Sequence, residues 1–226
     1  MKQNIDRISI QVGLSGYSFK IESDNDMHSS DWLSADRVFT TKEFQKRYEQ
    51  VDIAVFTPKT ALVPSQFHSP EVAKELLSKV VSINDDELVR SVEVPEFNSV
   101  LVYSNNIGET LTRVISETVL HTDGTKSQPL PVMYYMLKSL ADLPDYNKIL
   151  AAYADGVLYL VLAQGATLLL CNSFKAPDFT TAQYFIFLAL KRLQLNPEMS
   201  TITFMTALDY EQEMSLYRYF RSVEHI

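Results

Sequence analysis

The sequence predicts an α/β protein of two related subdomains, in which mixed sheets are flanked by helices. Two observations predict this fold class. The order hairpin, third strand, helix, strand, helix fits the first part of the chain and fits the last part again. In addition, a shift of 140 positions (156 minus 16) lays Gly16 on Gly156, each in the turn of a predicted hairpin. The repeated order carries more weight than the two glycines, because it constrains the topology.

The first part of the chain is predicted to contain four strands and a helix. Alternating apolar residues over 7–12 indicate the first strand, and a turn with two glycines leads into the second. Thr40 and Glu43 have the spacing of a capping box, which opens a helix through about Tyr48. The four strands are predicted over residues 7–12, 17–21, 38–40 and 51–56.

An inserted segment follows. Ser69 and Pro70 indicate a helix start, because proline at the first helical position loses no hydrogen bond. Extended pieces are predicted over 61–63, 87–94 and 99–103, the last two as an antiparallel pair, and helices over 107–119 and 131–143. Leu143-Pro144-Asp145 interrupts the pattern. We therefore expect residues 1–144 to form an N-terminal subdomain with an inserted strand pair, and residues 145–226 to form a C-terminal subdomain.

The last third of the chain has the clearest pattern. Asp155-Gly156 and Gln164-Gly165 are typical of hairpin turns between consecutive strands. Thr180 and Gln183 have capping-box spacing, and Asp209 is a predicted N-cap of the final helix. Strands are predicted over 148–154, 157–163, 166–173 and 201–205, and helices from Thr180 to about Leu195 and from Asp209 to about Phe220. Residues 223–226 look like the start of a further element, which would leave the C-terminal subdomain truncated.

Composition excludes several classes of protein. With 20 basic and 28 acidic residues, the net charge of −8 repels phosphate backbones, so we expect no nucleic-acid partner. Cys171 is the one cysteine, and no internal disulfide can form, as is typical of a reducing compartment. Residues 1–6 lack the apolar core of a signal peptide, and every apolar run is far shorter than the roughly 18 residues that span a bilayer. We expect a cytoplasmic protein without membrane insertion.

Few residues suggest a catalytic, metal-binding or partner-binding site. The four histidines are scattered and no H-x-x-x-H or C-x-x-C occurs, so neither a metal site nor a catalytic residue is predicted. The acidic run Asp85-Asp86-Glu87 is interpreted as a solvated junction. Aromatic residues of the last helix are attributed partly to the core and partly to a partner surface, because aromatics dominate interface energies. These residues are Tyr210, Tyr217, Tyr219 and Phe220.

Five short stretches carry a resemblance to known proteins. They are Arg7-Ile8-Ser9-Ile10, Gly16-Tyr17-Ser18-Phe19, Asn172-Ser173-Phe174, Tyr184-Phe185 and Leu193-Gln194-Leu195. Together with the duplication, they make the chain similar to an uncharacterised bacterial domain-of-unknown-function family with the actin-like ATPase fold. The resemblance implies two ribonuclease-H-like subdomains. The stretches are structural more than chemical signatures, so the resemblance implies no particular activity.

In active actin-like ATPases, two glycine-containing hairpins hold the nucleotide phosphates, and an acidic residue orients magnesium or water. The first hairpin of this chain has Gly13, Ser15 and Gly16 but no acid. The second has Asp155 and Gly156, followed by bulky residues where the active pattern has more glycine and a hydroxyl. Active members also place a glycine pair against adenosine, which this chain lacks. The resemblance therefore implies a nucleotide fold that has lost its nucleotide.

Two functions from different classes stay open. The leading hypothesis is a non-catalytic or degenerate actin-like-fold protein, not an enzyme, that acts through protein–protein interaction with an unknown partner and without a cofactor. The alternative is a divergent nucleotide-binding protein or ATPase that holds ATP with magnesium in the cleft between the subdomains. Only under this alternative are Gly13, Ser15, Gly16, Asp155 and Gly156 cofactor-binding residues.

Overall fold

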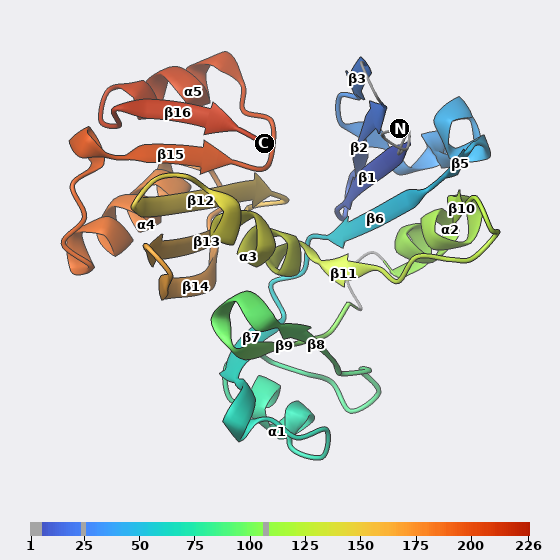
Figure 1. Cartoon of the computed structure of the whole chain (residues 1–226), viewed down its shortest axis with the longest axis horizontal. Helices are drawn as coiled ribbons and strands as arrows, with labels where there is room; N and C mark the ends of the chain where they lie inside the picture. The colour runs from blue at the N-terminus through green and yellow to red at the C-terminus, as the bar shows by residue number, and fades with distance from the viewer. Residues whose placement is uncertain (1–5, 24–25, 106–108) are drawn as a thin grey trace, which may run out of the picture. The chain divides into compact units, whose positions relative to one another are not determined.

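A computed structural model of the chain describes residues 6–23, 26–105 and 109–226. The chain forms two compact units, whose elements are labelled in Figure 1. Unit 1 comprises Met1–Thr57, Asp86–Leu88 and Ser104–Val132, and unit 2 comprises Pro58–Asp85, Val89–Tyr103 and Met133–Ile226. Residues 58–103 thus belong to unit 2, apart from Asp86–Leu88. The division into subdomains 1–144 and 145–226 stays a prediction.

The sheet of unit 1 is built around β1, which is paired on both sides. β1 (Arg7–Val12) runs antiparallel to β2 (Gly16–Ser23) and parallel to β6 (Gln50–Val55). The order of the strands is β11-β6-β1-β2-β3. At one end of the sheet, β3 (Asp26–Ser29) runs antiparallel to β2, which also pairs with β4 (Leu33–Ser34). At the other end, β11 (Leu130–Pro131) runs parallel to β6. Because β1 and β6 are parallel, the β1–β2 turn and the end of β6 lie at the same edge of the sheet.

Alternate residues of β1 supply the core of unit 1. Ile8, Ile10 and Val12 are buried because they lie on one face of the strand. They pack in one cluster with Ile53 of β6 and Ile115 of helix α2. The other elements of unit 1 are the 3₁₀ helices η1 (Ala35–Phe39) and η2 (Lys42–Gln45), helix α2 (Glu109–Thr118), and the strand pair β5 (Arg47–Tyr48) and β10 (Leu120–His121).

The larger sheet of unit 2 repeats the arrangement of unit 1. β12 (Asn147–Ala154) runs antiparallel to β13 (Val157–Gln164) and parallel to β15 (Thr201–Phe204). β14 (Thr167–Lys175) extends the sheet beyond β13 and β16 (Ser222–His225) beyond β15, which gives the order β14-β13-β12-β15-β16. Each pairing has the same sense as its counterpart in unit 1. The duplicated α/β topology predicted from the sequence is confirmed.

Helices α4 (Phe179–Arg192) and α5 (Tyr210–Tyr217) pack on this larger sheet. Ile186 of α4 and Leu216 of α5 join Leu160 and Ile202 of the sheet in one buried cluster. The two helices also touch, since Gln183 Nε2 donates a hydrogen bond to Ser215 Oγ. Unit 2 further contains α3 (Val132–Asp142), whose first residue belongs to unit 1, and the 3₁₀ helix η5 (Pro197–Met199).

A three-stranded antiparallel sheet completes unit 2. Its order is β7-β9-β8, with β7 (Thr60–Pro64), β9 (Ser99–Tyr103) and β8 (Arg90–Val94), and the 3₁₀ helices η3 (Ser65–Phe67) and η4 (Pro95–Phe97) flank the strands. Helix α1 (Ala73–Ser78) packs on it, because Leu77 shares a buried cluster with Val63 and Val102. The predicted antiparallel pair is confirmed. The predicted helix start at Ser69 is too early by several residues.

The largest errors of the sequence prediction lie before β6. Residues 38–40 do not form the third strand, because Val38 lies in η1 and β3 takes that place in the sheet. The helix predicted from Thr40 to Tyr48 is also wrong, since the short η2 and the strand β5 form there. Thr41, the N-cap of η2, makes no side-chain capping bond, and its hydroxyl instead bonds the buried Tyr17 hydroxyl (2.6 Å).

Two smaller corrections concern helix starts. The N-cap of α4 is Asp178 and not Thr180, because the Asp178 carboxylate accepts the N–H of Thr181 (2.7 Å). The predicted start of α2 at Ile107 lies outside the described residues, and the described helix begins at Glu109. Residues 223–225 belong to β16, which pairs in parallel with β15.

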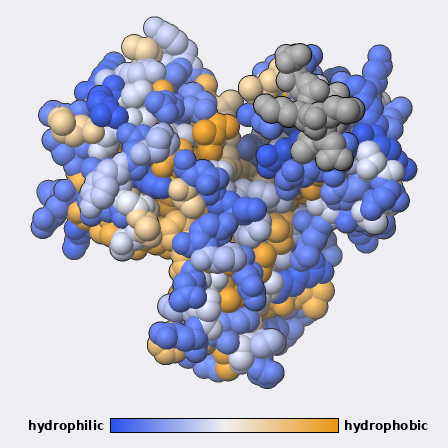
Figure 2. Space-filling view, in the orientation of Figure 1, coloured by the Kyte–Doolittle hydropathy of each residue, from blue (hydrophilic) through white to orange (hydrophobic). Residues whose placement is uncertain are grey.

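Polar and charged residues, drawn in blue, cover most of the face shown in Figure 2, and hydrophobic residues gather in smaller areas. The apolar side chains of the strands are mainly in the buried clusters instead. None of the helices in the described part of the chain is long and apolar enough to cross a membrane.

Asp209 is predicted to contribute to stability through its capping box. Its carboxylate accepts the Gln212 N–H (2.8 Å), and the Gln212 side chain accepts the Asp209 N–H (3.1 Å). Asp209→Ala removes the first of these bonds, so we expect a loss of about 1 kcal/mol in the free energy of unfolding, measured with urea. Asp31→Ala, at an exposed loop residue that caps no helix, is the control. Equal stability of the two variants would contradict the capping role.

Candidate functional site

The first candidate hairpin is a closed turn in unit 1. Val12 faces Tyr17 at the end of the β1–β2 pairing, and residues 13–16 connect them. The Gly13 N–H donates to the Gly16 carbonyl (2.9 Å), so this backbone donor is used inside the turn. Both glycines are buried, whereas Ser15 is exposed. Gly13, Ser15 and Gly16 are thus brought together, as the sequence predicted, in a turn that forms its own hydrogen bond.

Gly16 is required by a close approach of the backbone. Gly16 pairs with Ser34, and Tyr17 with Leu33, in the β2–β4 contact. A Cβ atom added to Gly16 would lie 2.0 Å from the Leu33 carbonyl oxygen. No side chain fits at that distance, and the obstacle is backbone rather than a movable side chain. Packing of the chain on itself therefore accounts for this glycine without a ligand.

Trp32 covers the same turn. Its indole Nε1–H donates to Ser15 Oγ (3.1 Å), and its ring contacts that of Phe56 with centroids 6.2 Å apart. Phe56 follows β6 and is fixed to β1, because its N–H donates to the Val12 carbonyl (2.8 Å). The hydroxyl and the glycine that would face a phosphate thus both contact the segment around Trp32 and Leu33.

The second candidate hairpin, in unit 2, is a two-residue turn. Ala154 faces Val157, and Asp155 and Gly156 between them have φ of 50° and 71°. Positive φ at both central residues is the geometry of a type I′ hairpin turn, for which Asp-Gly is a preferred sequence. The Gly156 carbonyl accepts the Ala176 N–H (2.8 Å). Turn geometry therefore accounts for this glycine, and Asp155 is exposed beside it.

The five candidate residues fall into two groups in different units: Gly13, Ser15 and Gly16 in unit 1, and Asp155 and Gly156 in unit 2. The nucleotide that the fold implies needs free backbone donors and room beside the glycines. In the first hairpin the Gly13 donor is bonded, Ser15 bonds Trp32, and the Leu33 backbone occupies the space beside Gly16. The residues of the first hairpin, as arranged here, do not fit a phosphate group.

A buried carboxylate lies in unit 1, and the sequence analysis missed it. Glu87 is only 4% exposed, and it is the one buried acid or base among the described residues. Ser104 Oγ donates to Glu87 Oε2 (3.1 Å), and Thr57 Oγ1 donates to the Ser104 carbonyl (2.8 Å). Thr57 follows β6, so this Glu87 cluster (Thr57, Glu87 and Ser104) lies next to the sheet edge that holds the first hairpin. The prediction that residues 85–87 are all solvated is wrong for Glu87.

Asn105, the next residue after the Glu87 cluster, carries an unpartnered acceptor. Its Nδ2 donates to the Pro129 carbonyl (3.0 Å), while its Oδ1 is buried without a hydrogen-bond partner among the described residues. The amide cannot be turned over, because its oxygen would then face the carbonyl oxygen of Pro129. A buried acceptor of this kind needs a partner, such as a water molecule that donates a hydrogen bond or a cation that the oxygen coordinates.

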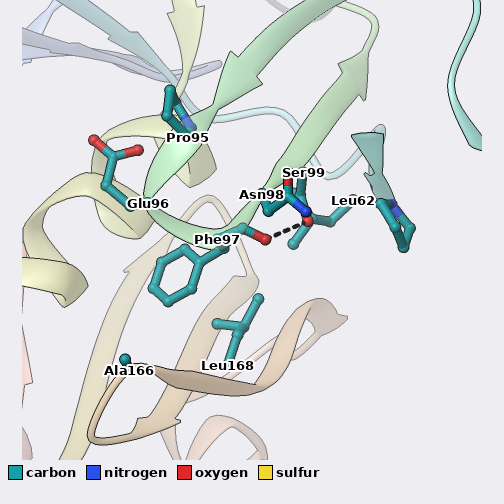
Figure 3. Close-up of a pocket in the computed structure, with 9 residues that line it drawn as sticks. Leu62, Pro95, Glu96, Phe97, Asn98, Ser99, Ala166 and Leu168 are labelled. Carbon is teal, nitrogen blue, oxygen red and sulfur yellow. Dashed lines mark hydrogen bonds between the residues drawn. The ribbon is translucent and has the colours of Figure 1, made fainter. Parts of the chain in front are cut away.

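A cavity with a volume of about 540 Å³ lies in unit 2. Figure 3 shows the Phe97 ring pointing toward Ala166 and Leu168, with Leu62 on the other side. Glu96 is its one charged lining residue, and no candidate residue from the sequence analysis lines it. The cavity therefore has the chemistry to accept an apolar side chain and lacks the groups for phosphate binding.

The thiol and imidazole groups show no arrangement for chemistry either. Burial raises the pKa of the Cys171 thiol to about 12, so this thiol is protonated and unreactive at neutral pH. His68 Nε2 bonds Ser91 Oγ (2.9 Å) at an exposed position. Within the described ranges, no three His, Cys, Asp or Glu side chains come close enough to hold a metal ion.

Solved structures match the arrangement described above. A protein of unknown function from Bacteroides thetaiotaomicron VPI-5482, with an actin-like ATPase fold, matches with a TM-score of 0.65 at 20% identity, over 100% of this chain and 92% of that one. A chain of the PilM–PilN type IV pilus biogenesis complex matches with a TM-score of 0.56 at 14% identity, over 99% of this chain and 88% of that one. None of the curated proteins matches.

These likenesses and the two repeated sheets define the class: the protein has the actin-like ATPase fold, built from two ribonuclease-H-like units. The model of the DUF3822 family, described as a protein of unknown function, matches residues 6–223. The chain therefore belongs to the DUF3822 family. The family resemblance and fold predicted from the sequence are confirmed.

The close approach at Gly16 predicts a large cost of substitution. Gly16→Ala is expected to lower the free energy of unfolding by about 3 kcal/mol or more, because the new Cβ must displace the Leu33 backbone. The control is Gly124→Ala, where no atom lies within 4 Å and only the positive φ of 83° opposes alanine, at a cost of about 1–2 kcal/mol. Urea unfolding measures both. A Gly16→Ala protein as stable as wild type would contradict the packing explanation.

The Glu87 cluster predicts a second effect on stability. Ser104→Ala removes one donor from the buried carboxylate, and a hydrogen bond to a charged group contributes about 1.5–3 kcal/mol. We expect a loss of that size in urea unfolding. Ser82→Ala, at an exposed serine, should change stability by less than about 0.5 kcal/mol. Similar losses in the two variants would show that Glu87 does not depend on Ser104.

Proposed function

We propose that this protein is a non-catalytic member of the actin-like fold that acts through protein–protein interaction. One observation carries the proposal: the first hairpin, where an active member would hold phosphate, is covered by Trp32 and Leu33 of the same chain. A phosphate could enter only after the Trp32 indole left Ser15 and the β2–β4 pairing at Gly16 opened. Both changes would break bonds that the chain makes with itself.

The second hairpin gives the same indication. An active phosphate loop offers several free N–H groups in succession. The Asp155-Gly156 turn has only two residues, and bulky side chains follow at once in β13. One chain similar in fold to this protein occurs in the PilM–PilN complex, so the fold is compatible with a role in an assembly. We propose an unknown protein as the partner of this chain.

A second candidate function is a divergent nucleotide-binding protein that uses ATP with magnesium. One observation favours it: Glu87 places a buried carboxylate next to the edge of unit 1 that holds the first hairpin. This carboxylate could take the part of the acid that the hairpin itself lacks. The unpartnered Asn105 Oδ1 would supply a further oxygen ligand or acceptor. Under this alternative, Trp32 has to leave Ser15 before nucleotide binds.

Thermal melting with and without millimolar MgATP separates the two functions. A ligand at a hundred times its dissociation constant stabilises the folded state by about 2.7 kcal/mol, which raises the melting midpoint by several degrees. We expect no rise. A rise that disappears in Glu87→Gln or Asp155→Asn would overturn the non-catalytic proposal. Asp36→Asn, at an exposed acid outside both hairpins, is the control for loss of charge.

Trp32 offers a second and more local readout, because it is the single tryptophan of the chain. Its fluorescence depends on the contacts of the indole with Ser15 and Phe56. Ser15→Ala should change the emission of the folded protein, whereas MgATP should leave the emission of the wild type unchanged. A saturable change on adding MgATP would instead indicate that the nucleotide displaces Trp32 from the hairpin.

A further inference from the structure

Helix α5 presents an apolar stripe to the solvent. Tyr210, Met214 and Tyr217 are spaced at i, i+4 and i+7, so they lie on one side of the helix. Their exposed fractions are 76%, 43% and 45%, whereas Leu216 on the other side is fully buried. A helix on the surface of a protein ordinarily turns polar residues outward. The Tyr217 hydroxyl donates to the Val223 carbonyl (3.2 Å), but none of the three side chains belongs to the buried cluster of unit 2.

The aromatic residues that follow α5, Tyr219 and Phe220, contact the rest of unit 2 instead of forming part of this stripe. Phe220 is buried, and the Tyr219 ring contacts Phe187 of α4 with centroids 4.9 Å apart. The aromatic series predicted from the sequence thus separates into two parts. Phe220 and Tyr219 hold α5 to α4, and the α5 stripe (Tyr210, Met214 and Tyr217) faces outward.

The charges beside the α5 stripe are arranged with opposite sign at its two ends. Glu211 follows Tyr210 and Arg218 follows Tyr217, and both are exposed. Neither side chain forms an ion pair or side-chain hydrogen bond with any described residue. By contrast, Glu213 lies 3.6 Å from His225 and Arg221 lies 3.1 Å from Asp145. One acid and one base therefore remain free, seven positions apart along the same side of the helix.

We propose that α5 is the interface of a homodimer in which the α5 helices of two copies pack antiparallel about a two-fold axis through Met214. The axis brings residues 210 and 211 of one copy against residues 217 and 218 of the second. Tyr210 packs on Tyr217, Glu211 pairs with Arg218, and Met214 meets its own counterpart. Each contact occurs twice, as a two-fold interface requires.

The charges beside the α5 stripe indicate that its binding partner is a second copy of this chain. The stripe is acidic near its start and basic near its end, so the surface that complements it must carry the same charges in reverse order. An antiparallel α5 has this pattern, whereas a parallel one would place acid on acid and base on base. The contact involves two turns of helix and is smaller than the roughly 800 Å² per partner of a stable interface. We therefore expect a weak dimer that dissociates on dilution.

Sedimentation velocity of the full chain from about 1 to 300 μM, spanning the range of weak association, tests the proposal. The wild type should pass from monomer to dimer within this range. Arg218→Glu and Glu211→Arg should each remain monomeric at the highest concentration, because each opposes like charges twice. An equimolar mixture of these two variants should dimerise again, since each copy then complements the other. The double variant, which exchanges the charges, should dimerise like the wild type.

The control is Arg113→Glu, which reverses an exposed charge on a helix of unit 1 and should leave dimerisation unchanged. Circular dichroism of each variant shows whether the helix content of the whole chain is retained. A wild type that stays monomeric throughout would overturn the proposal. So would a dimer that the single charge reversals leave intact, or one that the mixture fails to restore. These outcomes do not depend on whether MgATP binds, so the two proposals can fail separately.

Discussion

In each large sheet the central strand is paired antiparallel on one side and parallel on the other, and this pairing determines where the loops lie. In unit 1, Val12 at the end of β1 faces Val55 at the end of β6, so the hairpin turn and the chain leaving β6 meet at one edge. Trp32 reaches the turn there by packing on Phe56. In unit 2, the parallel pairing of β12 with β15 gives the Asp155-Gly156 turn the equivalent position. Topology alone thus explains why the candidate residues lie where they do.

The sequence predicted elements whose signal is local. The hairpins β12–β13 and β13–β14 follow from apolar runs joined by turn dipeptides, and the Asp209 cap follows from a spacing of three residues. Segment 26–48 was not predictable in this way, because β3 is exposed on every residue and gains its structure only by pairing with β2. The burial of Glu87 depends on Ser104, which is 17 residues further along the chain. Contacts of that range leave no pattern in a short stretch of sequence.

The glycines of the two hairpins have structural roles that involve no ligand. Gly16 admits the Leu33 carbonyl, and Gly156 adopts the positive φ of its turn. Either structural requirement would favour glycine even in a protein that binds no nucleotide. The glycines therefore do not distinguish the two functions. The non-catalytic proposal rests on a neighbouring side chain instead, because the indole of Trp32 bonds the Ser15 hydroxyl that a phosphate would otherwise contact.

The hairpin edge of unit 1 and the α5 stripe also differ in the free energy that a binding partner could gain there. At the hairpin edge of unit 1, Gly13 bonds Gly16, Ser15 bonds Trp32 and Ser104 bonds Glu87. A ligand that enters there exchanges one hydrogen bond for another, which contributes little net free energy. The exposed tyrosines of α5 lose contact with water when a second surface covers them, at about 25 cal/mol per Å² of apolar area. The proposed association through α5 would therefore be driven by apolar burial, whereas at the hairpin edge the buried Asn105 oxygen is the group whose hydrogen bonding a ligand could still improve.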